Sequence, residues 1–310
     1  MSALARLRTL SETMVAESPV FIIGAPRSGT SLLYRILQGH SDFRPRTLNL
    51  EETAIFQQLW RLPFFGDRVP SSLFRYMLED EDSYSAFLAT IRPLRALATL
   101  LLIPNVLLRH RAGWWWRHVN RSDLVLRAYF YFAKRARGCN LIVEKTPENW
   151  RFIDGLLGAF PRCRMLYLCR HPVEQFASYR RRAKDDADAG WAALSVGDFC
   201  VDYLRSTQTV LRAQQSRRAP LLLVHYEELT SNTEEAFHRI CDFLGVPFEP
   251  EALRGSNPER IRWPADPHLF GDVRRQTKVW QELVSPLEAV EIEERLTRVM
   301  GALGYQSLIA

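Results

Sequence analysis

The sequence contains few cysteines, and their spacing excludes the usual cysteine-based frameworks. There are five, an odd number, and no C-x-x-C pair occurs among them. Neither a disulfide scaffold nor a cysteine-bound zinc site is therefore indicated, and a reducing compartment fits this pattern best. The chain also lacks low-complexity tracts and repeats of fixed period, which argues against disordered, solenoid and propeller proteins. Its 310 residues, 47% of them hydrophobic, are enough for a buried core.

Nothing in the sequence has the length of a membrane-spanning helix. The one candidate, Leu94 to Leu108, is interrupted by Pro104 and is shorter than the roughly 18 to 20 apolar residues that a spanning helix needs. The first 19 residues lack the apolar core of a signal peptide, so we expect a cytoplasmic protein. Residues 94–116 end in three tryptophans. Contact with a membrane surface and burial in a core or pocket are the two interpretations of this segment.

A large excess of positive charge is also missing. The chain has 41 Lys and Arg against 35 Asp and Glu, a net charge of +6. A dedicated nucleic-acid binder concentrates a larger excess on one face, so we expect no nucleic-acid partner and favour a small anion instead. Arginines gather between Arg162 and Arg182 and between Arg254 and Arg275. A solvated protein face is the ordinary explanation of such runs.

Short apolar runs alternate with helical patterns along the chain, which is typical of an α/β fold with a mainly parallel sheet. The apolar runs predict buried strands at residues 19–23, 140–143, 164–169 and 220–225. Periodicity and capping signals predict a helix that opens at Pro172 and further helices at residues 28–38, 148–160, 196–215, 233–244 and 286–303. We expect one domain over residues 1–310, with helices flanking the central sheet and an α-helical insertion at about 54–138. The spacing of Gly24 and Gly29 directly after the first predicted strand makes this sheet P-loop NTPase-like.

The first predicted strand leads into a glycine loop, Gly24-Ala25-Pro26-Arg27-Ser28-Gly29-Thr30-Ser31, and then into a helix. This order creates an anion site, because the first N–H groups of a helix are unpaired and the helix dipole favours negative charge there. The two glycines are spaced as in the P-loop pattern G-x-x-x-x-G-K-[ST], but Thr30 occupies the position of the lysine. Arg27 supplies the positive charge of the loop instead, with hydroxyl donors on Ser28, Thr30 and Ser31.

This loop resembles the 5′-phosphosulfate-binding loop of the sulfotransferases that use 3′-phosphoadenosine 5′-phosphosulfate (PAPS). A second stretch, Arg170 to Ser178, follows a strand and opens a helix. It resembles the 3′-phosphate site of that family, an arginine followed eight positions later by a serine. The segments Glu144-Lys145-Thr146-Pro147 and Val224-His225-Tyr226-Glu227-Glu228-Leu229 resemble the family too. The resemblance implies PAPS as sulfuryl donor, 3′-phosphoadenosine 5′-phosphate (PAP) as product and no metal. It implies nucleotide binding by Arg27, Ser28, Gly29, Thr30, Ser31, Arg170 and Ser178.

The resemblance also implies in-line sulfuryl transfer with a glutamate base. Glu51-Glu52-Thr53 is similar to the Glu-Glu-Thr of the tyrosylprotein sulfotransferase branch, whose second glutamate is the base, and this match assigns the base to Glu52. The stretch between Arg27 and the glutamates is longer than in that branch, so Glu51 is the reserve candidate. A helix N-terminus that favours both carboxylates is the alternative. Lys145 and Arg27 are assigned charge stabilisation in catalysis, and a surface ion pair is the alternative for Lys145.

Further candidates surround this set. Tyr226 is a candidate for contact with the adenine or sugar, and a tyrosine that caps a core strand is the alternative. Arg274 and Arg275 stand where sulfotransferases carry a basic segment over the nucleotide, and a solvated face is the alternative. His40, which follows the loop helix, is a weaker candidate for the base.

The acceptor carries a hydroxyl or amine, on a small molecule, carbohydrate, lipid or peptide tyrosine. Its pocket is expected in the insertion at about 54–138, in which we recognise no motif of the family. Two other hypotheses compete with the sulfotransferase. One is an ATP-dependent kinase with a degenerate P-loop, against which the missing lysine argues. The other is a protein that binds the nucleotide without turnover.

Overall fold

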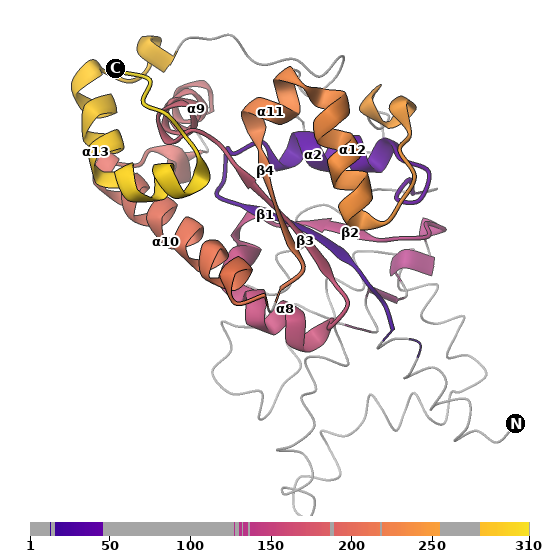
Figure 1. Ribbon diagram of the computed structural model, residues 1–310. Helices are drawn as coiled ribbons and strands as arrows, with labels where there is room; N and C mark the ends of the chain where they lie inside the picture. Colours follow the sequence, from indigo (N-terminus) through magenta and orange to yellow (C-terminus); the bar gives the residue numbers. More distant parts are fainter. Residues whose placement is uncertain are drawn as a thin grey trace, which may run out of the picture.

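A computed structural model describes most of the chain outside residues 46–126 and 255–279. The described residues are 13, 16–45, 127, 130–131, 133–135, 137–186, 189–217, 219–254 and 280–309. In this part, parallel strands form one sheet in the order β2-β1-β3-β4 (Figure 1). The strands are β1 (Val20–Gly24), β2 (Val143–Lys145), β3 (Arg164–Cys169) and β4 (Leu221–His225).

Helices cover both faces of this sheet (Figure 1). One face carries α2 (Thr30–Gly39) and α12 (Thr233–Leu244), with α11 (Tyr226–Ser231) between β4 and α12. The other face carries α8 (Ile153–Ala159), α9 (Pro172–Asp185), α10 (Val196–Gln215) and α13 (Pro286–Leu303). Short 3-10 helices are η3 (Pro147–Phe152), η4 (Gly190–Ala192), η5 (Pro250–Arg254) and η8 (Trp280–Glu282).

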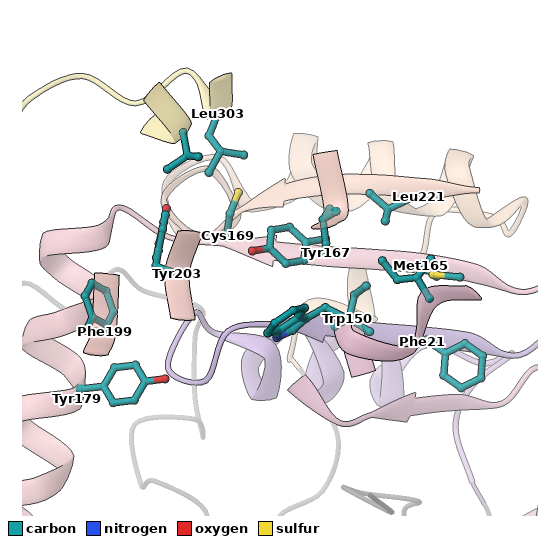
Figure 2. Packing of buried hydrophobic residues seen from close by; sticks show 14 of the residues in the cluster. Phe21, Trp150, Met165, Tyr167, Cys169, Tyr179, Phe199, Tyr203, Leu221 and Leu303 are labelled. Carbon is teal, nitrogen blue, oxygen red and sulfur yellow. The ribbon is translucent and has the colours of Figure 1, made fainter. Parts of the chain in front are cut away.

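Side chains of the central strands alternate between two hydrophobic clusters, one on each face. Phe21 and Tyr167 pack with residues of α8, α9, α10 and α13, whereas Ile22 and Leu168 pack with residues of α2 and α12. Figure 2 shows part of the first cluster, in which Tyr167 and Cys169 of β3 lie toward Tyr203 of α10 and Leu303 of α13. Because both faces are buried, β1 is apolar at every position before Gly24, as expected of a central parallel strand.

The α/β fold class is confirmed, and the predicted bounds of β3, α10, α12 and α13 agree with the structure. The strand predicted at 140–143 is wrong, since β2 runs from Val143 to Lys145. The backbone N–H groups of Asn140 and Leu141 both donate to the carbonyl of Asp42, at 3.0 and 2.9 Å, so these residues bond the segment after α2 instead of joining the sheet. The predicted helix at 148–160 is a 3-10 helix followed by the short α8.

Most of the predicted insertion lies outside the described residues, and the single-domain arrangement stays a prediction. The end of the insertion is described, and its helical residues include Phe130 and Tyr131. Residues 94–116 also lie outside the described part. Among the helices that the structure describes, none is long and apolar enough to cross a membrane.

Candidate functional site

The loop between β1 and α2 is built from unusual backbone angles and close packing. Arg27 has a φ of 66° and Gly29 a φ of 101°, both in the left-handed region. A Cβ atom at Gly24 would lie 2.7 Å from the carbonyl oxygen of Leu168 and 2.8 Å from Oγ of Ser28, so only glycine fits there. No side chain caps α2 at Gly29, and its first turn has no acidic residue. The N–H of Leu32 donates to the carbonyl of Gly29 at 3.0 Å, whereas the N–H groups of Thr30 and Ser31, the first two of the helix, have no acceptor within it and suit an anion.

The two sequence motifs meet at Arg27 and Ser178, which are 151 residues apart in the chain. Nε of Arg27 donates a hydrogen bond of 3.1 Å to Oγ of Ser178 on α9. One helical turn earlier, Nε2 of Gln175 donates to the carbonyl oxygen of Pro26 at 2.7 Å. The parallel pairing of β1 with β3 explains the contact, because it sets the loop after β1 beside the helix after β3.

Arg170 and Tyr226 form a second contact at the same edge of the sheet. The guanidinium carbon of Arg170 lies 4.3 Å from the centre of the Tyr226 ring, a distance typical of a cation–π interaction. Nη2 of Arg170 is 3.5 Å from the carboxylate of Glu174, one turn into α9. The Tyr226 ring also packs on the loop, since a Cβ atom at Gly29 would lie 2.9 Å from Cε2 of this ring. Tyr226 thus contacts both predicted phosphate-binding segments.

Lys145, at the end of β2, also reaches the loop. Its Nζ donates to Oγ of Ser31 at 3.3 Å, and the residue is only 6% exposed. This burial argues against a position on the surface, which the alternative of a surface ion pair requires. The adjacent Glu144 is fully buried, and its carboxylate accepts hydrogen bonds from Thr146 and from Nδ2 of Asn149. The pairing of β1 with β2 places Lys145 opposite Ile22, two residues before the loop.

Among the buried side-chain atoms without a hydrogen-bond partner in the described part of the chain, two belong to the two predicted phosphate-binding segments. They are Oγ of Ser28, whose residue has no exposed surface, and Nε of Arg170. Native proteins pair more than nine in ten of their buried polar groups, so such orphans require an explanation. An anionic ligand with several oxygen acceptors would satisfy both. The residues present therefore fit a ligand that presents an anionic group to each segment.

Burial decides the protonation of two side chains beside this region. It raises the pKa of Cys169, the last residue of β3, to about 12, so Cys169 is a neutral thiol near pH 7 and a poor nucleophile. Burial is also the main cause that raises the pKa of Tyr179. The charges of Glu148 and Asp202 raise it further, and the charge of Arg27 opposes them. Neither group offers a base or nucleophile at neutral pH.

Several candidates lie apart from this cluster or outside the described residues. Glu51, Glu52, Arg274 and Arg275 belong to the segments that the structure does not describe. His40 lies at the end of α2 opposite the loop, with Nε2 2.8 Å from the carbonyl oxygen of Pro247. Its Nδ1 accepts the N–H of Asp42 at 3.1 Å, so His40 is engaged in local structure. Within the described part, no group of three or more His, Cys, Asp or Glu could hold a metal ion.

Sequence reasoning missed Gln175 and Glu227. Gln175 stands three positions before Ser178, a helical spacing that puts both on one face and signals a shared partner. Glu227 accepts the backbone N–H of His171 at 2.8 Å and the hydroxyl of Tyr305 at 3.1 Å. No sequence signal joins these residues, because they come from three separate segments.

Comparison with known proteins identifies one matching family profile and a distant curated relative. A profile described as "Sulfotransferase family" matches residues 19–250. A curated protein from Aquifex aeolicus (strain VF5), described as an uncharacterized protein, is 21% identical over 241 residues, which are 77% of this chain and 27% of that protein. The chain thus spans little more than a quarter of the length of that relative.

Solved structures of sulfotransferases share the fold. The sulfotransferase domain from the curacin biosynthetic pathway has a TM-score of 0.52 at 19% identity, over 94% of this chain and 98% of that one. The domain from the Synechococcus PCC 7002 olefin synthase has a TM-score of 0.51 at 21% identity, over 91% and 96%. The sulfotransferase STF9 from Mycobacterium avium has a TM-score of 0.53 at 15% identity, over 98% and 81%.

Proposed function

The chain belongs to the sulfotransferase family, and from this premise we propose that it moves a sulfuryl group from PAPS to a hydroxyl or amine acceptor. The observation that carries the proposal is the hydrogen bond between Arg27 and Ser178. It joins the loop that resembles the 5′-phosphosulfate site to the helix that resembles the 3′-phosphate site. One ligand with an anionic group at each end suits this arrangement better than a triphosphate.

Binding is divided between the two segments. The N–H groups of α2 and the side chains of Arg27, Ser28, Thr30 and Ser31 hold the 5′ end, with Gly29 providing the close backbone approach. Arg170 and Ser178 hold the 3′-phosphate, and the unpaired Nε of Arg170 supplies one donor. Arg274 and Arg275 are the candidates that cover the nucleotide from the undescribed segment.

The chemical step is a direct transfer without a covalent enzyme intermediate. The acceptor oxygen or nitrogen forms a bond to sulfur while the bond from sulfur to the 5′-phosphate oxygen breaks, and PAP leaves. Glu52 takes the proton that the acceptor loses, with Glu51 in reserve. Lys145 and Arg27 stabilise the negative charge that develops on the bridging oxygen and the transferring group. Arg27 thus serves binding and catalysis.

Calorimetry with PAP tests the binding half of the proposal. Arg27→Ala and Arg170→Ala are each expected to weaken PAP binding about 10- to 100-fold, because a hydrogen bond to a charged group contributes about 1.5–3 kcal/mol. Arg295→Ala is the matched control, since this arginine is exposed and pairs with Glu291 on α13. Equal PAP affinity in all three variants and the wild type would contradict the site.

Transfer of labelled sulfate from PAPS to cell extracts tests the catalytic half. Glu52→Gln and Lys145→Met are expected to lower kcat at least about 100-fold while Glu52→Gln leaves PAP affinity unchanged. Full activity of Glu52→Gln together with loss in Glu51→Gln would move the base to Glu51. PAP binding without transfer to any fraction would favour a binding protein, and phosphate transfer from ATP would favour the kinase.

We also propose that residues 1–310 form one sulfotransferase domain whose helical insertion, at about 54–138, lines the acceptor pocket. The support comes from the sequence, because the motifs that resemble the family lie on either side of this segment and none of them lies within it. Fractionation of the labelled extract into small molecules, carbohydrate, lipid and protein identifies the acceptor class. Substitutions in the insertion should then change KM for that acceptor and leave PAP affinity unchanged.

A further inference from the structure

We propose that Tyr226 is a positioning residue that couples the two phosphate subsites, so that the preference for a 3′-phosphorylated nucleotide depends on its aromatic ring. This inference rests on the proposed function. It gives Tyr226 a role that acts through Gly29 and Arg170, in place of the expected contact with adenine or sugar.

One edge of the Tyr226 ring packs against the loop between β1 and α2. A Cβ atom at Gly29 would lie 2.9 Å from Cε2 of Tyr226 and closer still to Cδ2, so the ring occupies the space that any side chain at position 29 would need. Gly29 itself has a φ of 101° and immediately precedes α2. The ring therefore limits where the turn that presents the N–H groups of α2 can lie.

The same ring supports the guanidinium of Arg170. The distance of 4.3 Å from the guanidinium carbon to the ring centre is that of a close cation–π contact. Glu174 lies 3.5 Å from Nη2 and restrains the group from another direction. Nε remains buried and without a hydrogen-bond partner among the described residues. Arg170 is thus held in place while at least one donor is left for a ligand.

Hydrogen bonds join the backbone segments that carry Tyr226 and Arg170. Tyr226 opens α11 directly after β4, and its carbonyl accepts the hydroxyl of Thr230 at 2.9 Å. The next residue, Glu227, accepts the N–H of His171, which follows Arg170 in the chain. Because the neighbours of Tyr226 and Arg170 are bonded to each other, a shift of either side chain is transmitted to the other.

The coupling has a consequence for ligand choice. The 3′-phosphate binds the guanidinium of Arg170 that the ring already holds, and the same ring limits the position of Gly29 at the 5′ end. A nucleotide that lacks the 3′-phosphate cannot contact Arg170 and therefore gains nothing from the position in which the Tyr226 ring holds this arginine. The ratio of the dissociation constants of adenosine 5′-monophosphate (AMP) and PAP, here called the 3′-preference, therefore measures the role of Tyr226.

Calorimetry of PAP and AMP with position-226 variants tests the inference. Tyr226→Phe keeps the ring, and its 3′-preference is expected to stay within about threefold of the wild type. Tyr226→Leu removes the ring, and its 3′-preference is expected to fall about 3- to 30-fold, the range that corresponds to a cation–π contribution of about 0.5–2 kcal/mol. The control is Tyr131→Leu, which removes a ring from another arginine pair, that of Arg135 at 5.3 Å.

A shape-preserving variant covers the case in which Tyr226→Leu does not fold. Trifluorophenylalanine at position 226 keeps the ring and its packing but removes the negative face that attracts a cation. Its 3′-preference should fall below that of Tyr226→Phe.

The outcomes separate the two proposals. If PAP and AMP lose affinity by the same factor in Tyr226→Leu, the ring contacts the part that both ligands share, and the coupling is overturned. An unchanged 3′-preference in the fluorinated variant overturns it too. A wild-type protein that binds PAP no better than AMP would overturn the proposed function itself.

Discussion

Arg27 and Gly29 carry the two positive φ angles of the loop between β1 and α2. Glycine adopts such an angle easily, whereas for arginine it costs about 1–3 kcal/mol. The surrounding contacts hold the strained residue, since Ser178 accepts from its side chain and Gln175 donates to the preceding Pro26. Strain of this kind concentrates at functional sites, and Arg27 is the residue that the proposed mechanism uses twice.

Substitution of Gly29 tests whether the loop requires glycine at this position for stability and for PAP binding. Gly29→Ala is expected to lower the free energy of unfolding by about 1–3 kcal/mol, because alanine is strained at this φ and its Cβ would collide with Tyr226. PAP affinity should fall as well. Gly158→Ala is the control, because no atom lies within 4 Å of the position that its Cβ would take on α8, and it should keep or raise stability. Chemical unfolding and calorimetry measure both effects, and equal results for the two variants would contradict the packing.

At the scale of elements, the side chain of His171 caps the N-terminus of α9 and is neutral in this role. Nδ1 of His171 accepts the N–H of Val173 at 3.3 Å, which caps the helix. The proton is therefore on Nε2, which lies 3.0 Å from the carbonyl oxygen of Gln306 and donates to it. The ring also packs edge-on against Tyr305, with centroids 5.3 Å apart. The segment after α13 thus supports the turn that carries Arg170.

Burial lowers the pKa of His171 below its ordinary value of 6.5 and is the largest cause of the shift. The hydrogen bond to Gln306 opposes burial, as do the charges of Glu293, Glu227 and Glu174. A histidine with a lowered pKa takes up its proton more readily in the unfolded chain. Its contribution to stability is therefore complete above pH 6.5 and is lost as the pH falls from 6.5 through the folded-state pKa.

Acid should consequently destabilise the protein through His171. The free energy of unfolding is expected to fall below pH 6.5 by at most about 1.4 kcal/mol per pH unit from this group. His171→Asn keeps a capping acceptor for α9 and should flatten this part of the profile. His238→Asn, at an exposed histidine of α12, is the control for removal of a histidine from the surface. Denaturant unfolding between pH 5 and 8 measures the slopes, and parallel profiles for wild type and His171→Asn would refute the assignment.

At the scale of the whole molecule, three phenylalanines join segments that are far apart in the chain. Phe130, at the end of the predicted insertion, lies edge-on to Phe21 of β1 at 5.5 Å and to Phe160 after α8 at 5.1 Å. All three side chains are fully buried. The end of the insertion is therefore part of the main hydrophobic core.

Removal of this anchor should affect the whole fold. Phe130→Ala is expected to lower the free energy of unfolding by about 3–5 kcal/mol, the usual effect of a phenylalanine-sized cavity. Leu287→Ala is the control, because Leu287 is 83% exposed on α13, and it should change stability by less than about 0.5 kcal/mol. Denaturant unfolding provides the comparison. A small effect of Phe130→Ala would mean that the insertion folds without the core.

Local signals explain which predictions agree with the structure. The starts of α10 and α13 follow from the capping residues Ser195 and Ser285, whereas α12, which no side chain caps, follows from its periodicity and from Gly245 at its end. These signals act over a few residues. The strand predicted at 140–143 is wrong because its apolar pattern says nothing of Asp42, whose carbonyl binds Asn140 and Leu141. Local patterns also fail to predict the role of Glu227, because its two partners lie on other segments of the chain.

The sequence by itself determined the α/β order, the glycine loop without a lysine that is the candidate anion site, and the candidate pair of Arg170 and Ser178, since each depends on neighbours in the chain. Tertiary structure alone decided that Arg27 meets Ser178 and that Tyr226 lies against both Gly29 and Arg170. The physical reason is the strand order, which sets the loops after β1, β3 and β4 side by side at one edge of the sheet. No local pattern encodes that order.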